Sequence, residues 1–217
     1  MVEEKTKQGE DLVSYLIEII RKAEQNTTVW TGGTTTQLAI FPKDALYSER
    51  NFLWRMSSAK VEVEESVFTS LPGIRRLIMV LEGELQLDHE GHHKIALAPF
   101  EQDRFRGDWT TKSRGKVTDF NLMMADGWEG SLEAITLPKG AARRFALPDS
   151  ISPAAVTEAI YCVKGKIDIR VDERTETLES GDFFSLLSEK KTSVALAIIN
   201  SNENETQVVH ARVFHEE

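Results

Sequence analysis

The chain has 217 residues, of which 41% are hydrophobic and 28% charged, and its formal net charge at pH 7 is −9. This acidic balance disfavours non-specific binding to nucleic acid, which requires a basic surface. The apolar runs are far shorter than the roughly 20 residues that cross a bilayer, and the polar N-terminal segment is unlike a secretion signal. The single cysteine excludes an internal disulfide and a zinc site built on several thiolates. We therefore expect a cytoplasmic protein without a nucleic-acid or membrane partner.

The segment 11–23 fits two kinds of secondary structure. Leu16 and Ile20 belong to an apolar stripe with helical spacing, whereas Tyr15, Ile17 and Ile19 recur at every second position as on one face of a strand. Periodicity leaves both alternatives open for this segment.

After residue 30 the sequence consists mainly of short runs rich in β-branched and aromatic residues, separated by Gly, Pro, Asn or Asp. The expected strands cover residues 52–57, 58–63, 75–81, 85–87, 94–97, 117–123, 132–137, 159–163, 166–171, 183–187, 194–199 and 208–214. Many short strands with frequent turn signals predict an all-β sandwich or barrel with few or no helices.

One pattern of strand, glycine and strand occurs twice in the chain. Ile78–Leu87 parallels Ile160–Ile169, and their glycines, Gly83 and Gly165, are 82 positions apart. A period this long favours duplication of a whole β domain over a solenoid, whose repeats are usually shorter. The alternative is a chance similarity between two hairpins.

The duplication predicts how the chain is divided. The two copies would meet near residues 126–131, where the polar segment between strands lies. The predicted parts are an N-terminal segment over 1–29, a first barrel over 30–125 and a second barrel over 126–217.

Four segments of the first half carry a resemblance when they are taken in order: Val29–Leu38, Trp54–Ala59, Phe68–Arg76 and Asp119–Met123. Together they resemble the HutD/Ves family, and the repeated strand pattern is similar to that of cupin barrels. The resemblance implies a bicupin, with two cupin-like barrels in one chain. It also implies a protein encoded near histidine-utilisation genes in some bacteria, with a binding or regulatory role for a small metabolite.

Because the resemblance is to cupins, the sequence must be checked for a cupin metal centre. Such a centre uses two histidines two residues apart, a nearby carboxylate and a further histidine on a later strand. The five histidines are His89, His92, His93, His210 and His215. None belongs to the expected strands 75–81 or 117–123. The first three belong to a turn that we expect to be solvated and able to chelate a divalent ion only adventitiously, and the last two are expected at the surface. We expect no intrinsic metal and no cofactor.

No nucleophile stands out in the sequence. Cys162 lies in an apolar run, where a free cysteine usually serves as a small core residue. Gly32 and Gly33 precede three threonines but lack the lysine and the spacing of a phosphate loop, so a tight turn is the favoured interpretation. The catalytic residues, if there are any, stay unknown.

The strongest candidate for a site is a set of polar residues within apolar, strand-like runs: Arg55, Arg76, Asp119 and Asn121. Asp119 and Asn121 are two residues apart and share a face of their strand. A buried carboxylate requires a partner, and one arginine paired with Asp119 would leave the other free to bind an anionic ligand. The remaining predicted ligand-binding residues are Thr35 and Ser57, as polar contacts, and Trp54 and Phe100, as walls. The alternative is a structural salt bridge without a ligand.

These features support three hypotheses about function. The first is a non-catalytic protein that binds a small anionic metabolite in the first barrel and has a regulatory or accessory role. The second is a metal-free isomerase or hydrolase with Asp119 as general base, against which pairing with an arginine would argue by lowering the carboxylate pKa. The third is a structural or interaction protein, for which exposed sheet edges would provide the surface of a homodimer.

Overall fold

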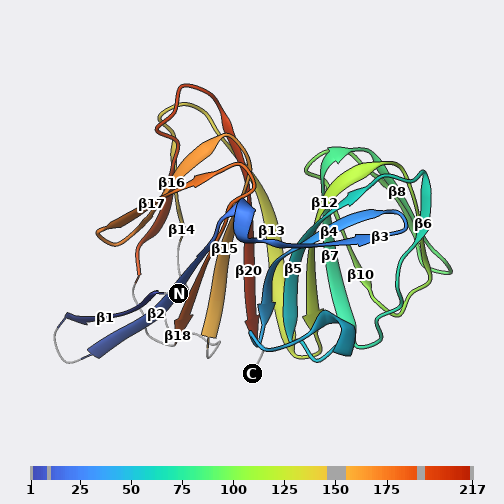
Figure 1. The fold of residues 1–217 in the computed structure, drawn as a ribbon, viewed down its shortest axis with the longest axis horizontal. Coiled ribbons are helices and arrows are strands. Elements are labelled where there is room, and N and C mark those ends of the chain that lie inside the picture. The colour runs from blue at the N-terminus through green and yellow to red at the C-terminus, as the bar shows by residue number, and fades with distance from the viewer. Residues whose placement is uncertain (1, 9–10, 146–154, 190–193, 216–217) are drawn as a thin grey trace. The chain divides into compact units, whose positions relative to one another are not determined.

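The structure is a computed structural model that describes residues 2–8, 11–145, 155–189 and 194–215 (Figure 1). Its regular elements are strands, with short 3-10 helices at Lys22–Glu24 and Tyr47–Glu49. The predicted all-β fold is confirmed. Among the described residues, no helix combines the length and the apolar character that a membrane span requires.

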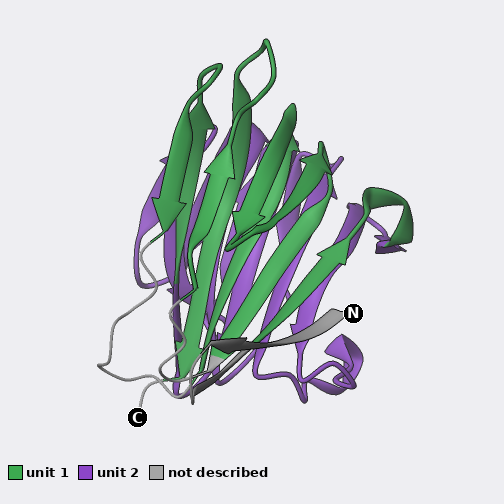
Figure 2. Ribbon diagram, turned by 90° about the vertical axis from the view of Figure 1, so that its left-hand side faces the viewer, with its two compact units in different colours: residues 1–24, 131–217 green, residues 25–130 purple. Residues whose placement is uncertain are grey.

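The chain divides into two compact units, shown in separate colours in Figure 2. Unit 2 is Gln25–Gly130, and unit 1 combines Met1–Glu24 with Ser131–Glu217. The segment expected to stand alone at 1–29 is therefore shared between the units, and the division between the two halves lies after residue 130.

Unit 2 contains two antiparallel sheets. The six-stranded sheet has the order β10 (Gln102–Arg106), β7 (Ile74–Gly83), β12 (Val117–Ala125), β5 (Trp54–Val61), β4 (Gly33–Phe41) and β3 (Asn26–Trp30). The four-stranded sheet has the order β6 (Glu65–Val67), β11 (Thr111–Arg114), β8 (Leu85–His89) and β9 (Lys94–Leu97). A core cluster joins residues of both sheets, among them Ile78 and Val80 of β7 and Leu85 and Leu87 of β8. The apolar side chains that alternate along these strands thus fill the space between the sheets.

Unit 1 repeats this plan. Its six-stranded sheet has the order β1 (Val2–Gln8), β2 (Asp11–Ile20), β18 (Phe183–Glu189), β15 (Ala155–Lys164), β20 (Thr206–His215) and β13 (Trp128–Leu137). Its four-stranded sheet has the order β14 (Ala142–Phe145), β19 (Leu196–Ile199), β16 (Lys166–Val171) and β17 (Arg174–Glu179). The core contains Ile160 and Cys162 of β15, Ile167 and Ile169 of β16, and Phe184 of β18.

The ambiguous segment 11–23 forms a strand over most of its length. Tyr15 and Ile17 are buried, and the strand pairs antiparallel with β18, where Tyr15 is aligned with Ser188 and Ile20 with Phe183. The partner strand is distant in the sequence. Local periodicity therefore contains no information about the hydrogen bonds that select a strand here over a helix.

The two copies of the sequence repeat occupy corresponding places. Gly83 and Gly165 follow a long buried strand and adopt positive φ values of 87° and 91°. A Cβ atom on Gly83 would lie 2.4 Å from the carbonyl oxygen of Lys116, a distance that no side chain tolerates. Strand β7 pairs with β12 in the first copy, and β15 pairs with β20 in the second. Sequence repeat and strand pairing agree, as duplication of a β domain requires.

Candidate ligand-binding site

Strand β12 lies between β5 and β7 and sets the positions of the candidate site. Met123 is aligned with Arg55 on β5 and with Arg76 on β7, so the two arginines flank it. Asn121 and Asp119 lie two and four residues earlier on β12. Residues at intervals of two share one face of a strand, and this face of the sheet therefore carries both arginines, the amide and the carboxyl group.

These side chains line a cavity of about 360 Å³ in unit 2. Six of the eight residues predicted to bind a ligand line it: Thr35, Arg55, Ser57, Arg76, Asp119 and Asn121. Sequence reasoning missed three aromatic residues in the lining, Trp30, Tyr47 and Phe68. Trp30 and Phe68 belong to segments that carry the family resemblance, which is the signal that points to them. Tyr47 lies in a 3-10 helix without a recognisable motif.

The structure places the other two predicted wall residues elsewhere. Trp54 precedes Arg55 on β5 and therefore points to the opposite face of the sheet, where its ring stacks on Phe41 with centroids 5.7 Å apart. Phe100 lies in the turn after β9, and its backbone N–H donates to the carbonyl of Val80. Neither is among the residues that line the cavity.

Arg55 is buried among neutral partners. Its side chain donates from Nε to Oε1 of Gln37 at 3.0 Å and from Nη1 to the hydroxyl of Ser57 at 3.2 Å. Its guanidinium carbon lies 4.4 Å from the ring centroid of Tyr47. Burial lowers the pKa of Arg55. The positive charge is thus held by dipoles and an aromatic face and is not neutralised by a carboxylate.

Arg76 is 7% exposed and packs between aromatic rings. Its guanidinium carbon lies 4.7 Å from the ring centroid of Phe68 and 5.1 Å from that of Phe105. Burial lowers its pKa to about 10, which still leaves the side chain charged at neutral pH. Its Nε atom is buried and has no hydrogen-bond partner in the protein.

Asp119 differs from its prediction. The sequence predicts that an arginine pairs with Asp119 and lowers its pKa. Among the described residues, however, neither Arg55 nor Arg76 forms an ion pair with it, and its Oδ1 is buried without a partner. Burial raises the pKa of Asp119 to about 7, and the charge of Arg76 opposes that rise only in part. Desolvation outweighs a Coulomb attraction across a longer distance, so the carboxyl group is partly protonated at neutral pH.

The unpaired polar atoms of the site are the clearest evidence that it binds a ligand. Arg76 Nε, Asp119 Oδ1 and Asn121 Oδ1 are buried, border one cavity, and have no hydrogen-bond partner among the residues that the structure describes. More than about nine in ten buried polar groups are hydrogen-bonded in native proteins, because an unmade bond costs about 1–3 kcal/mol. One donor and two acceptors left unpaired together are typical of a site whose hydrogen bonds a ligand completes.

The cavity does not suit a catalytic metal of the kind that cupin barrels hold. The corresponding strands carry Arg76, Ile78 and Val80 on β7, and Asp119 and Asn121 on β12. A divalent cation would find two oxygen-bearing side chains and no imidazole on these strands, with two guanidinium cations at the same cavity. The donor set and the local charge both favour an anion.

At the corresponding place in unit 1, a buried carboxylate forms ion pairs within the protein. Glu158 is fully buried, and its two carboxylate oxygens accept hydrogen bonds from His210 Nε2 at 2.6 Å and Arg212 Nε at 2.7 Å. The prediction that His210 lies at the surface is wrong, because the histidine is 7% exposed. This carboxylate already has internal partners and needs no ligand to satisfy it.

The paired sheets of each unit define a bicupin, and solved structures agree with this class. A mutant oxalate decarboxylase from Bacillus subtilis superposes with a TM-score of 0.62 at 7% identity, over 91% of this chain and 77% of that chain. The conserved protein of unknown function PA5104 from Pseudomonas aeruginosa PAO1 superposes with a TM-score of 0.74 at 22% identity, over 91% and 98% of the two chains.

The chain belongs to the HutD family, whose model matches residues 22–203. HutD from Pseudomonas fluorescens SBW25 superposes with a TM-score of 0.68 at 22% identity, over 93% of this chain and 100% of that chain. No curated protein gives a significant match. The family and the bicupin fold that the sequence motifs predicted are both confirmed.

Proposed function

We propose that this HutD-family chain binds a small organic anion, a carboxylate, in the cavity of unit 2, and has a regulatory or accessory role in metabolism. The observation that carries the proposal is the pair of buried arginines, Arg55 and Arg76. They face one cavity, and within the described part of the chain no carboxylate lies at ion-pair distance from them. A buried charge is costly unless it is paired, and a ligand carboxylate would supply the missing negative charge.

The unpaired atoms narrow the chemistry of the ligand. Arg76 Nε is a donor and suits a carboxylate oxygen, whereas Asn121 Oδ1 is an acceptor and suits an N–H or O–H group. We therefore expect an acid that also carries a hydrogen-bond donor. A volume of about 360 Å³ lies at the lower end of the range for small-molecule sites, which favours a metabolite over a polymer.

The biological role is proposed from family membership. The resemblance to the family implies a binding or regulatory role linked to histidine utilisation, and the composition of the chain favours a cytoplasmic location. An acidic intermediate of amino-acid breakdown would be captured and its level sensed. A homodimer and the absence of nucleic-acid and membrane partners are part of the same proposal.

The proposal is tested by calorimetric titration of small carboxylic acids, from formate and acetate to hydroxy and amino acids, into the folded protein. Arg76→Gln and Arg55→Gln are expected to weaken binding at least tenfold each, because each removes a charge from the cavity. Arg114→Gln is the matched control, since Arg114 is an exposed residue of β11. Binding that survives both cavity substitutions, or that Arg114→Gln weakens equally, would contradict the proposal.

The pH dependence of affinity provides a second test. Because Asp119 has a pKa of about 7, lowering the pH through that value neutralises it and removes a negative charge from the cavity. Affinity for a carboxylate is expected to rise as the pH falls through this value, with uptake of a proton on binding just above it. Asp119→Asn should abolish this pH dependence of affinity. A pH dependence that persists in the variant would show that Asp119 is not its source.

A second candidate function is a metal-free isomerase or hydrolase with Asp119 as general base. The observation that favours it is the raised pKa of Asp119, about 7, which is the range that suits proton transfer at neutral pH. The rate of any turnover detected by ligand screening would then rise with pH through this pKa, and Asp119→Asn would abolish it. Tight binding without turnover would favour the binding protein.

A further inference from the structure

Three side chains of unit 2, which we call the hairpin cluster, converge outside the cavity: His89, His93 and Asp103. His89 is the last residue of β8, and His93 follows the turn that Gly91 allows by its positive φ of 77°. The backbone N–H of His89 donates to the carbonyl of His93, which closes the turn and brings the two rings to one side. Asp103 comes from β10, in the other sheet of the unit.

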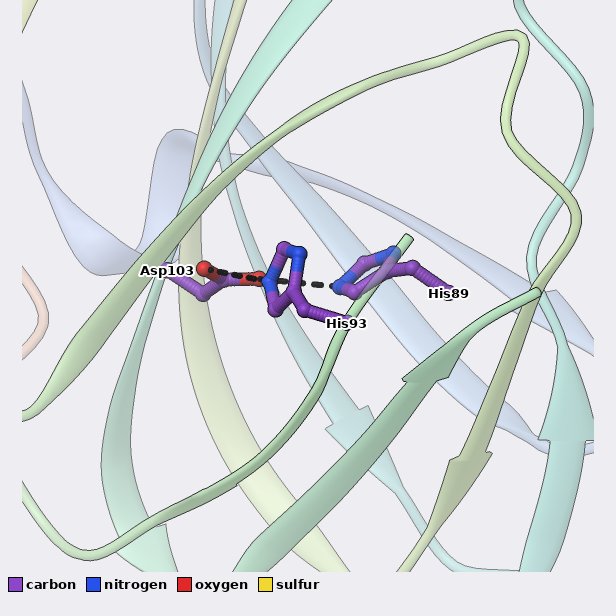
Figure 3. A group of neighbouring side chains, drawn as sticks. All are labelled: His89, His93 and Asp103. Atoms are coloured by element: carbon purple, nitrogen blue, oxygen red, sulfur yellow. Dashed lines mark hydrogen bonds and ion pairs between the residues drawn. The ribbon is translucent and has the colours of Figure 1, made fainter. Parts of the chain in front are cut away.

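The donor atoms of the hairpin cluster point toward one another (Figure 3). His89 Nε2 lies 2.9 Å from Asp103 Oδ2, and His93 Nε2 lies 3.1 Å from both carboxylate oxygens of Asp103. All three groups lie within 4.8 Å of one another. The His89 side chain is fully buried and that of Asp103 is 10% exposed, whereas 39% of the His93 side chain is exposed. The expectation that these histidines belong to a solvated turn is therefore wrong for His89.

We propose that the hairpin cluster is a zinc site, with His89 Nε2, His93 Nε2 and one oxygen of Asp103 as ligands. Zinc bound by two imidazoles and a carboxylate keeps a fourth position for water, which can reach the cluster beside the half-exposed His93 ring. Tetrahedral bonds of about 2.0–2.1 Å place ligand atoms about 3.3 Å apart. The histidine–aspartate distances therefore need to open by only a few tenths of an ångström.

The surroundings of His89 fit this role. Its second ring nitrogen, Nδ1, lies 2.8 Å from the hydroxyl of Thr111, and its ring packs against Phe105 with centroids 4.6 Å apart. Metal-bound histidines usually form a hydrogen bond through the other nitrogen, which holds the ring and its tautomer. A hydroxyl can accept as well as donate. Thr111 can therefore donate to Nδ1 when Nε2 carries the proton, and accept from Nδ1–H when Nε2 binds zinc.

His92 lies in the same turn but has a different environment. Its ring stacks on Trp109, with centroids 3.7 Å apart and an interplanar angle of 12°. It does not belong to the group of donor atoms that converge. The hairpin thus carries two proposed zinc ligands, His89 and His93. His92 is a nearby histidine outside the cluster, and its substitution tests for non-specific chelation at the surface.

The hairpin cluster is separate from the ligand-binding cavity, because none of its three residues lines that cavity. Zinc here would link the β8–β9 turn to β10 and thereby tie the two sheets of unit 2 together. Its predicted effect is structural and does not depend on whether the cavity binds a carboxylate.

The experiment titrates Zn²⁺ into untagged, metal-free protein by calorimetry and, in parallel, follows Co²⁺ by its visible absorption. One equivalent of Zn²⁺ is expected to bind and to raise the melting temperature, and Co²⁺ should give the intense bands of a four-coordinate site. His93→Ala and Asp103→Asn should each weaken Zn²⁺ binding at least tenfold, while His92→Ala leaves it unchanged. His93→Gln replaces His93→Ala if the latter does not fold.

Two results would overturn the proposal. One is folded wild-type protein that takes up no Zn²⁺ at micromolar concentrations. The other is binding that His92→Ala weakens as much as His93→Ala and Asp103→Asn do, or that none of the three substitutions changes. The second result means adventitious chelation only. After either result, the hairpin cluster is a hydrogen-bonded support of the turn.

Discussion

Arg76 and Glu158 occupy corresponding positions in the two units, 82 residues apart, and opposite charges stand at these positions. Arg76 is aligned with Met123 on the neighbouring strand, whereas Glu158 is aligned with Arg212. The carboxylate of Glu158 is therefore satisfied across the strand pair, and the guanidinium of Arg76 is not. The same place in a duplicated barrel is an internal ion pair in one copy and a candidate anion site in the other.

The ion pairs of Glu158 lead to a prediction about stability. Glu158→Gln removes the negative charge that His210 and Arg212 share in a buried environment, and we expect it to lower the free energy of unfolding by about 3 kcal/mol or more. Urea denaturation at neutral pH measures the change. Glu133→Gln is the matched control, because Glu133 is 3.8 Å from His210 and 48% exposed, and its loss should cost less than about 1 kcal/mol. Equal effects of the two substitutions would contradict the prediction.

The raised pKa of Asp119 predicts that stability falls as the pH rises. Between about pH 4 and pH 7 the folded state keeps a proton that the unfolded state has released, so the free energy of unfolding decreases with pH across this window. Asp119→Asn removes this penalty. At about pH 8 the free energy of unfolding of the variant should exceed that of the wild type by up to about 4 kcal/mol, because the raised pKa lies about three units above its ordinary value and each unit corresponds to about 1.4 kcal/mol. Near pH 4 the two proteins should be equally stable.

Urea denaturation of both proteins at about pH 4.5, 6 and 8 tests this prediction, since these values span the window between the two pKa values. The control is Asp108→Asn, because Arg106 lowers the pKa of Asp108, and its small effect should have the opposite sign. A stability difference between Asp119→Asn and the wild type that is constant over this range would show that Asp119 is ionised throughout.

Gly83 and Gly91 differ in what surrounds them although both adopt positive φ, 87° and 77°. A Cβ atom at Gly83 would meet the backbone of Lys116 at 2.4 Å, whereas one at Gly91 would meet nothing within 4 Å. Gly91→Ala should therefore cost only the conformational strain, about 1 kcal/mol. Gly83→Ala adds a clash with backbone and should cost about 3 kcal/mol or more. Thermal and urea unfolding of the two variants measure these losses of stability. Equal losses in the free energy of unfolding would contradict the prediction.

Cys162 is predicted to be unreactive in the folded protein. The side chain is fully buried, and burial raises the pKa of its thiol to about 12, so very little of the reactive thiolate forms. A disulfide reagent at mildly alkaline pH should modify no thiol in native protein and one thiol per chain in denaturant. Because the chain has one cysteine, the signal has a single source. Rapid modification of native protein would show that β15 opens or that the thiol is accessible.

Much of the site followed from strand periodicity. Asp119 and Asn121 share a face because they are two residues apart, and Arg55 and Arg76 lie in runs whose alternation sends them inward. The same alternation places Trp54 opposite Arg55, so its assignment to the cavity wall contradicted a rule that was already available. Strand alternation does not apply to Phe100, because this residue lies in a turn after β9.

Other features required contacts between distant segments. The strand over 11–20 depends on β18, and the partner of His89 is Asp103, which no histidine spacing indicates. The pKa of Asp119 depends on whether an arginine contacts its carboxyl group. A difference of a few ångströms in the distance between the two groups decides whether this pKa is lowered or raised.

The sequence by itself determined the all-β class and the shared face of Asp119 and Asn121, because alternation and turn glycines act over a few residues. Its four ordered motifs carried the resemblance to the family, and that resemblance implied the bicupin. Only the tertiary structure decided which charges are paired: Glu158 with His210 and Arg212, His89 with Asp103, and Arg76 with no carboxylate in the described ranges of the chain. Coulomb attraction and desolvation depend on distance and burial in space, and strand pairing across the sheets sets both.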